Sequence, residues 1–304
     1  MLIDIFTDPL QYAFMRRALI EVVLMGAVTG AIGTYVVLRG LTFMGDALAH
    51  AIFPGIVIAF LLDQSIFVGA LAFGVLTSIA IGVIARNQRV TEDSAVGVLF
   101  AGTFALGVVL ISSQRNFARD LTSFLFGNVL GVSETDIVLS VIIGAVVLAT
   151  LVLLHKELLA ASFDRLAAQA MGLPVFWLDL MLLVLVSLTI VVSLRSVGNI
   201  LVVAMLITPP ATARLLTERL ARTVGLSSLL GAAAGVIGLY ISYHQDVAAG
   251  GTIVLVSTGG FLLAWLLSPG HGLVTTRLMR RRVAIVVQPE AQVLLESPEI
   301  RSHR

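Results

Sequence analysis

The chain has 304 residues, of which 58% are hydrophobic and 12% are charged, and its formal net charge at pH 7 is +1. A mean hydropathy of +1.04 excludes a water-soluble globular domain. The small net charge gives no indication of a nucleic-acid partner, and the lack of cysteine excludes a disulfide framework and a thiolate metal site. We therefore expect an all-α polytopic membrane protein.

Apolar segments of about 20 residues, long enough to cross a bilayer, recur along nearly the whole sequence and predict about nine transmembrane helices. The expected organisation is an N-terminal interfacial segment at 1–17, a transmembrane domain at 18–268 and a flexible, basic cytoplasmic tail at 269–304. In the first span, Gly26 and Gly30 form a small-xxx-small face that lets membrane helices approach closely. The spans are expected at about 18–38, 42–62, 65–85, 94–113, 134–154, 174–194, from 199 onward, 223–243 and 249–268.

The second span carries two ionisable residues in a very apolar context, Asp46 and His50. Four residues apart, they lie on one face of a helix, where they could hold one metal ion. An ionisable group inside a span costs at least about 2.5–3.5 kcal/mol and usually faces a partner, a cavity or a transport path. The alternative is that Asp46 caps the helix after Gly45 while His50 bonds a neighbouring carbonyl.

Prolines interrupt two of the predicted spans. Pro54 follows His50 by one turn, and Pro209 and Pro210 break the segment that starts near residue 199. Proline has no N–H and frees a carbonyl, so such broken helices usually line a protein interior or a cavity. We expect these helix breaks to line a transport pathway, and there are eight spans rather than nine if the seventh segment only dips into the membrane.

The distribution of Lys and Arg predicts the orientation of the chain. With the N-terminus outside and the C-terminus inside, 14 of the 19 Lys and Arg residues fall on the cytoplasmic side. The reverse orientation inverts this imbalance, so the positive-inside rule selects an external N-terminus. The short basic turn at 86–89 and the polar loop at 156–173 are then cytoplasmic.

Motifs for covalent chemistry are absent from the sequence. It contains no G-x-x-x-x-G-K-[ST], HExxH or GxSxG motif and no Ser-His-Asp spacing typical of a hydrolase. We therefore expect no enzymatic activity in the chain itself. Energy for concentrating a solute would come from an ion gradient or from a separate ATPase subunit.

Four stretches carry a resemblance to a known family. They are Arg39–Gly55 (RGLTFMGDALAHAIFPG), Phe163–Pro174 (FDRLAAQAMGLP), Val197–Arg214 (VGNILVVAMLITPPATAR) and Asp246–Leu255. Together, and in this order, they resemble the permease subunits of bacterial manganese, zinc and iron ABC importers, over nearly all of residues 10–268. The resemblance implies the type II ABC importer permease fold and a multi-pass protein of the bacterial cytoplasmic (inner) membrane.

The resemblance also implies the partners and the cargo. In that family two permease copies form the pathway, a cytoplasmic ABC ATPase drives it, and an extracytoplasmic metal-binding protein delivers the ion. Asp46 and His50 match the family's metal ligands, no resident cofactor is implied, and the cargo would be Mn²⁺, Zn²⁺ or Fe²⁺. Such a mixed oxygen and nitrogen set cannot name the ion by itself. Pro54 is more like the manganese and iron branch, which favours manganese.

Two further groups of residues follow from the resemblance. The loop at Phe163–Pro174 resembles the coupling helix that docks on the ATPase, and the residues expected to make that contact are Asp164, Arg165, Ala167, Ala170 and Gly172. His244 and Asp246 lie in the outer turn before the last span. They could take the ion from the binding protein or simply be solvated turn residues.

Two other classes of protein would show different features. An ion-coupled secondary metal transporter would be expected to contain inverted repeats and coupling carboxylates in mid-span, and neither is clear in the sequence. An intramembrane metalloprotease would need a third ligand and a general base near Asp46 and His50. The absence of HExxH argues against it.

Overall fold

The structure is a computed structural model that describes residues 7–87, 89–112 and 129–268, and the expected tail at 269–304 lies outside these residues. Within the described part, every regular element is a helix. The elements are η1 (Pro9–Gln11), α2 (Ala13–Leu38), α3 (Thr42–Ala51), α4 (Phe53–Leu61), α5 (Ile66–Ala85), α6 (Glu92–Ser112), η2 (Val129–Gly131), α8 (Glu134–Leu153), α9 (His155–Phe163), α10 (Arg165–Ala170), α11 (Val175–Val197), α12 (Asn199–Leu216), α13 (Leu220–Gln245) and α14 (Ala249–Leu267).

The prediction of an all-α protein with nine spans is confirmed. Among the described residues, nine helical segments are long and apolar enough to cross a membrane, and α3 and α4 together form one of them. The observed ends agree with the expected ones within a few residues for most spans. The first span is different, because α2 begins at Ala13 and includes residues that were expected to belong to the interfacial segment.

The second span is interrupted where Pro54 was expected to break it. Helix α3 ends at Ala51, Ile52 forms a turn, and α4 begins at Phe53 with Pro54 in its first turn. Proline is accommodated there because the first N–H groups of a helix have no intrahelical partner. Asp46 and His50 therefore lie on a short helix that ends just beyond them.

The expected break at Pro209 and Pro210 is wrong, because α12 is one continuous helix through both residues. Two missing N–H groups free the carbonyls one turn earlier, at Met205 and Leu206. A Cβ on Gly33 of α2 would lie 2.0 Å from the Leu206 oxygen and 2.9 Å from Pro210 Cγ. Gly33 thus brings its backbone directly against this proline turn, and the neighbouring helix packs around the freed carbonyl and stabilises α12.

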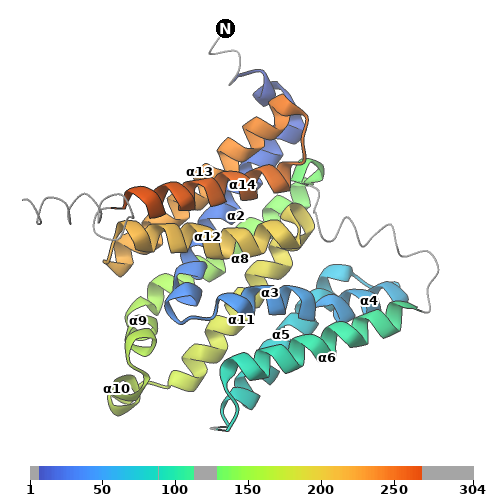
Figure 1. The fold of residues 1–304 in the computed structure, drawn as a ribbon. Coiled ribbons are helices and arrows are strands. Elements are labelled where there is room, and N and C mark those ends of the chain that lie inside the picture. The colour runs from blue at the N-terminus through green and yellow to red at the C-terminus, as the bar shows by residue number, and fades with distance from the viewer. Residues whose placement is uncertain (1–6, 88, 113–128, 269–304) are drawn as a thin grey trace, which may run out of the picture.

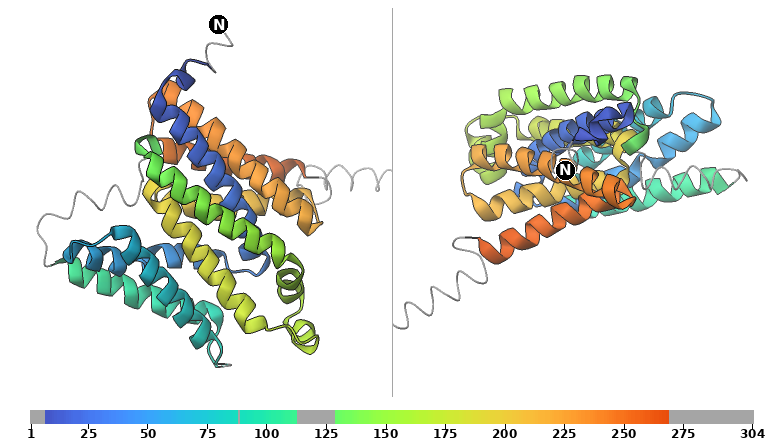
Figure 2. Two further views of the ribbon diagram at one scale, coloured as in Figure 1. Left: turned by 180° about the vertical axis from the view of Figure 1, so that it is seen from behind. Right: turned by 90° about the horizontal axis from the view of Figure 1, so that it is seen from above.

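The helices form two groups joined by α11. Helix α2 lies in the larger group, with α8, α12, α13 and α14, and it packs most extensively against α13. Helices α3 to α6 form the second group at one side, as both views of Figure 2 and the view of Figure 1 show. Helix α11 contacts members of both, including α5, α8 and α12. The short helices α9 and α10 lie at the end of the bundle away from the N-terminus (Figure 1).

The two ends of α5 test the orientation predicted from charge. Ser65 and Asn87 flank this helix, and both are exposed. In a chain without cysteine, we expect Ser65→Cys to react with an impermeant maleimide in intact cells. Asn87→Cys should react only after the membrane is opened, because the turn at 86–89 is basic. Labelling of Asn87→Cys in intact cells would show that the orientation is reversed.

Candidate functional site

Asp46 and His50 lie one turn apart on the same face of α3. The Nδ1 atom of His50 is 3.5 Å from Oδ1 of Asp46, and the two side chains are 23% and 45% exposed, respectively. The pair is therefore accessible from one side, while most of the other residues of α3, including Ala47, Leu48, Ala49 and Ala51, are buried. An open face of this kind can admit an ion.

The structure tests both parts of the alternative role, in which Asp46 caps the helix and His50 bonds a neighbouring carbonyl. Asp46 lies inside α3, whose N-cap is Leu41, so it does not cap the helix. His50 does contact a neighbouring carbonyl, because its Nδ1 lies 3.0 Å from the backbone oxygen of Asp46. If Nδ1 carries the proton and donates to this oxygen, Nε2 keeps its lone pair. That is the usual arrangement of a metal-binding histidine, so the carbonyl contact favours the ligand role rather than opposing it.

Asn199 is a third residue of this site, and no motif in the sequence points to it. Its Nδ2 lies 3.4 Å from both ring nitrogens of His50. Its side-chain oxygen Oδ1 is buried and has no hydrogen-bond partner among the described residues. Gly198, with a φ of 80°, forms the turn that starts α12 at Asn199. The feature of the sequence that could have indicated this residue is a single amide side chain at the start of an apolar span.

Two aromatic rings of α6 pack around the imidazole. The ring centroids of Phe100 and Phe104 are 5.7 Å and 5.8 Å from that of His50, and both contacts are edge-to-face. They restrict the orientation of the ring. The amide nitrogen of Asn199, rather than its oxygen, faces the imidazole; with the two amide atoms exchanged, the carboxylate, the imidazole and the amide oxygen would form a donor set that suits a divalent cation.

The structure does not bring the other predicted residues to this pair. Among the described residues no group of three or more His, Cys, Asp or Glu side chains could hold a metal. His244 and Asp246 are exposed at the α13–α14 turn, where Asp246 ends α13 with a φ of 52°. In the described part of one copy, Asp46, His50 and Asn199 are therefore the residues that lie together at this face.

The loop expected to be a coupling helix forms the short helix α10. The Asp164 side chain accepts a hydrogen bond of 2.9 Å from the Ala167 N–H and so caps the helix. Gly172, with a φ of 81°, ends it. Ala167 and Ala170 are exposed, as a docking role requires. Three apolar side chains that were not singled out are also exposed, namely Phe163 (73%), Leu166 (78%) and Met171 (66%).

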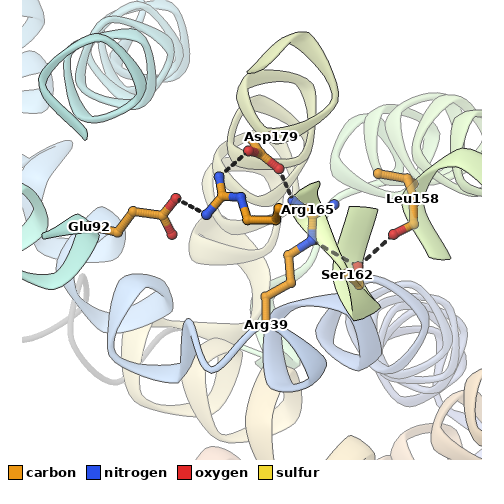
Figure 3. A network of polar contacts seen from close by, with 6 residues as sticks. All are labelled: Arg39, Glu92, Leu158, Ser162, Arg165 and Asp179. Carbon is orange, nitrogen blue, oxygen red and sulfur yellow. Dashed lines mark hydrogen bonds and ion pairs between the residues drawn. The ribbon is translucent and has the colours of Figure 1, made fainter. Parts of the chain in front are cut away.

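Arg165 connects α10 to the membrane helices through a network of ion pairs (Figure 3). Its guanidinium donates to Glu92 of α6 at 2.7 Å and pairs with Asp179 of α11. Asp179 also pairs with Arg39, which follows the end of α2 and donates to Ser162 of α9 at 2.9 Å. Burial lowers the pKa of the Arg39 guanidinium, and the charge of Asp179 opposes this effect. Arg165 therefore pairs with the bundle while 52% of its side chain stays exposed, and its expected contact with the ATPase stays a prediction.

A buried carboxyl in the first span was also missed by the sequence analysis. Glu21 of α2 is fully buried, and its Oε1 accepts hydrogen bonds from Ser140 of α8 at 2.8 Å and from Ser196 of α11 at 2.6 Å. Its other oxygen has no partner among the described residues. Ser196 lies three positions before Asn199, so Glu21 fixes the end of α11 from which the turn into α12 begins.

Comparison with known proteins gives the following relatives. The model of the ABC 3 transport family matches residues 11–268. The manganese transport system membrane protein MntC of Halalkalibacterium halodurans is 46% identical over 89% of this chain and 92% of its own. A Haemophilus influenzae protein named "Probable iron transport system membrane protein" is 38% identical over 86% of this chain and 96% of its own. The structure of PsaBC from Streptococcus pneumoniae in complex with Fab is similar, with a TM-score of 0.79 and 39% identity over 93% of this chain and all of that one.

The serine contacts of Glu21 predict how two substitutions differ. Glu21→Gln keeps an acceptor oxygen for both hydroxyls, whereas Glu21→Ala leaves them without it and opens a cavity. We expect Glu21→Ala to lower the free energy of unfolding by at least about 2 kcal/mol and Glu21→Gln to behave nearly as wild type in a thermal-unfolding assay in detergent. The matched control is Thr29→Val, whose buried hydroxyl bonds only to its own helix. Equal losses for Gln and Ala would mean that the carboxylate charge, rather than its acceptor oxygen, is required.

Proposed function

The chain belongs to the ABC 3 transport family, and from this premise we propose that it is the permease subunit of an ATP-driven importer of divalent metal ions, with manganese as the favoured cargo. It is a multi-pass protein of the bacterial cytoplasmic membrane. The observation that carries the proposal is the Asp46–His50 pair with Asn199 beside it. Its open face, its imidazole and the adjacent amide, whose oxygen has no hydrogen-bond partner among the described residues, are the features expected of a site that binds an ion and releases it.

The donor set suits manganese, and the names of the relatives favour manganese over zinc. The amide oxygen of Asn199 adds a second oxygen type to one carboxylate and one imidazole, and carboxylate and carbonyl oxygens suit Mn²⁺. The relative from Halalkalibacterium halodurans is named for manganese, and the one from Haemophilus influenzae for iron. Fe²⁺ accepts a similar mixture of ligands, whereas zinc would bind any such set more tightly than manganese by the Irving–Williams order. A manganese importer therefore cannot select Mn²⁺ against Zn²⁺ by binding affinity alone. In this proposal, an oxygen-rich coordination geometry provides the selection.

A second copy of the chain completes the pathway in this proposal. The three donors that one copy offers are fewer than the six oxygen or nitrogen ligands typical of Mn²⁺. Two copies related by a twofold axis would present two sets from opposite sides of a central pathway. The half-exposed Asp46 side chain supports this arrangement, since a face that meets a partner copy is open in a single one.

The cytoplasmic ATPase is proposed to dock on α10. Phe163, Leu166 and Met171 present apolar side chains on a polar loop outside the spans, and such a cluster indicates a contact with another protein. Arg165 would pass movement of α10 to Asp179 and from there to Arg39, three residues before α3 begins. An extracytoplasmic metal-binding protein would deliver the ion at the opposite face.

Substitutions at the three donors test the metal site. We expect Asp46→Ala and His50→Ala to abolish manganese uptake in cells that contain the ATPase and the binding protein, because each removes a ligand from the pathway. Asn199→Ala should weaken manganese binding to the purified permease about ten-fold or more. The control is His244→Ala, at the exposed α13–α14 turn, which should take up manganese normally.

The outcomes separate the possible roles of these residues. Normal uptake by both Asp46→Ala and His50→Ala would remove them from the pathway. Loss of folded protein in either variant, seen by size-exclusion chromatography, would assign that residue a structural role instead. Impaired uptake by His244→Ala would mean that His244 helps to take the ion from the binding protein and is not simply a solvated turn residue.

The coupling role predicts the effect of a charge on the exposed face of α10. Leu166→Glu places a carboxylate where an apolar contact is expected and should weaken co-purification of the ATPase at least about ten-fold. Val247→Glu is the matched control, because Val247 is also exposed but lies in the α13–α14 turn. Undiminished co-purification and ATPase stimulation in Leu166→Glu would exclude α10 as the docking element.

A further inference from the structure

A cavity of about 400 Å³ lies at the end of the bundle that carries α9 and α10. The ion-pair network of Arg39, Asp179, Arg165 and Glu92 forms one wall, with the side chains converging as in Figure 3. Most of the remaining wall is apolar and includes Ile81 of α5 and Leu182, Leu183 and Val186 of α11. A mostly apolar cavity of this size with a few convergent polar groups has the usual composition of a ligand site.

The charges that line the cavity do not balance. Arg39, Arg86 and Arg165 face only two carboxylates, Glu92 and Asp179. Both carboxylates are already engaged by Arg165, and Asp179 also by Arg39. The formal charge of the wall is therefore +1, which favours an anion.

Arg86 provides the excess charge. Its guanidinium carbon lies 5.4 Å from the centroid of the Phe176 ring, and it forms no ion pair within the described part of the chain. A cation over an aromatic face keeps its hydrogen-bond donors available for an anion. The residue is exposed, so these donors can be reached from outside.

A second observation at the same wall also indicates a missing partner. The Arg39 side chain is only 9% exposed, and its Nη2 has no hydrogen-bond partner among the described residues. A buried donor without an acceptor is costly and is normally satisfied in a native protein. Nη2 itself is closed to solvent, so an anionic oxygen bound in the cavity would supply the acceptor only after the guanidinium turns toward it.

We propose that this cavity binds an anionic phospholipid, with the phosphate at the arginines and an acyl chain along the apolar wall. Basic pockets between membrane helices at the cytoplasmic surface are suited to such headgroups. Free phosphate would satisfy the arginines but leave the apolar wall uncovered, so the lipid accounts for both parts of the cavity. The inference is independent of which metal the chain transports.

Lipid binding to the purified, delipidated full-length permease tests the proposal. Native mass spectrometry with phosphatidylglycerol, phosphatidylcholine or inorganic phosphate measures the affinities, and thermal stabilisation gives a second readout. We expect phosphatidylglycerol to bind more tightly than phosphatidylcholine. Arg86→Gln should weaken phosphatidylglycerol binding about five-fold, whereas the matched control Arg89→Gln, in the same turn but outside the cavity, should leave it unchanged.

A second variant tests the apolar part of the cavity without changing its charge. Ala85 lines the cavity, and Ala85→Leu should reduce phosphatidylglycerol binding because it fills space needed by the acyl chain. Equal binding of phosphatidylglycerol and phosphatidylcholine, or an unchanged affinity in Arg86→Gln, would overturn the proposal. Inorganic phosphate that binds as well as phosphatidylglycerol would also overturn it, since the occupant would then be a free anion.

Discussion

The close approach of α2 to its neighbours is the constraint on which the rest of the structure depends. A Cβ on Gly26 would lie 2.6 Å from the backbone of Gly231, and one on Gly30 would lie 2.6 Å from the carbonyl of Ser227. In a bilayer, apolar side chains gain little from leaving lipid, so packing at small residues and hydrogen bonds between helices hold the bundle together. Ser227 provides one such bond, donating to the Gly30 carbonyl at 2.7 Å. Side chains at these positions would separate α2 from α13.

This central helix positions both functional regions. At Gly33, α2 meets the proline turn of α12, the helix that begins with Asn199. Near its start, Glu21 binds Ser196 just before the same turn. At its end, Arg39 joins the ion-pair network, and Gly40, with a φ of 72°, turns the chain into α3. The residues of the proposed metal site and the contacts of α10 are therefore fixed relative to one helix, although they lie on different elements.

Local patterns in the sequence were sufficient to predict the spans and the Asp46–His50 pair. Hydropathy over about 20 residues depends only on neighbours in the chain, and the spacing of Asp46 and His50 lies within one helix turn. Asn199 could not be assigned in this way, because its contact with His50 joins residues 149 positions apart. The continuity of α12 could likewise not be predicted from its own sequence, since it depends on packing against Gly33 of α2. Glu21 was visible as a carboxyl in the first span, but its serine partners come from α8 and α11.

The two helix groups differ in how they can respond to a force at α10. Helix α2 meets α13 and α12 through backbone contacts at glycine, which leave no room for sliding. Helix α6 instead meets α10 at its end through the Glu92–Arg165 ion pair, and ion pairs of this kind can exchange partners at little cost where they are solvated. Because α6 packs against α3, movement of α10 is therefore expected to shift both helices against a fixed α2–α12–α13 group. Because His50 lies between Phe100 of α6 and Asn199 of α12, such a shift would change the distance between the donors themselves, which is what the release of a bound ion requires.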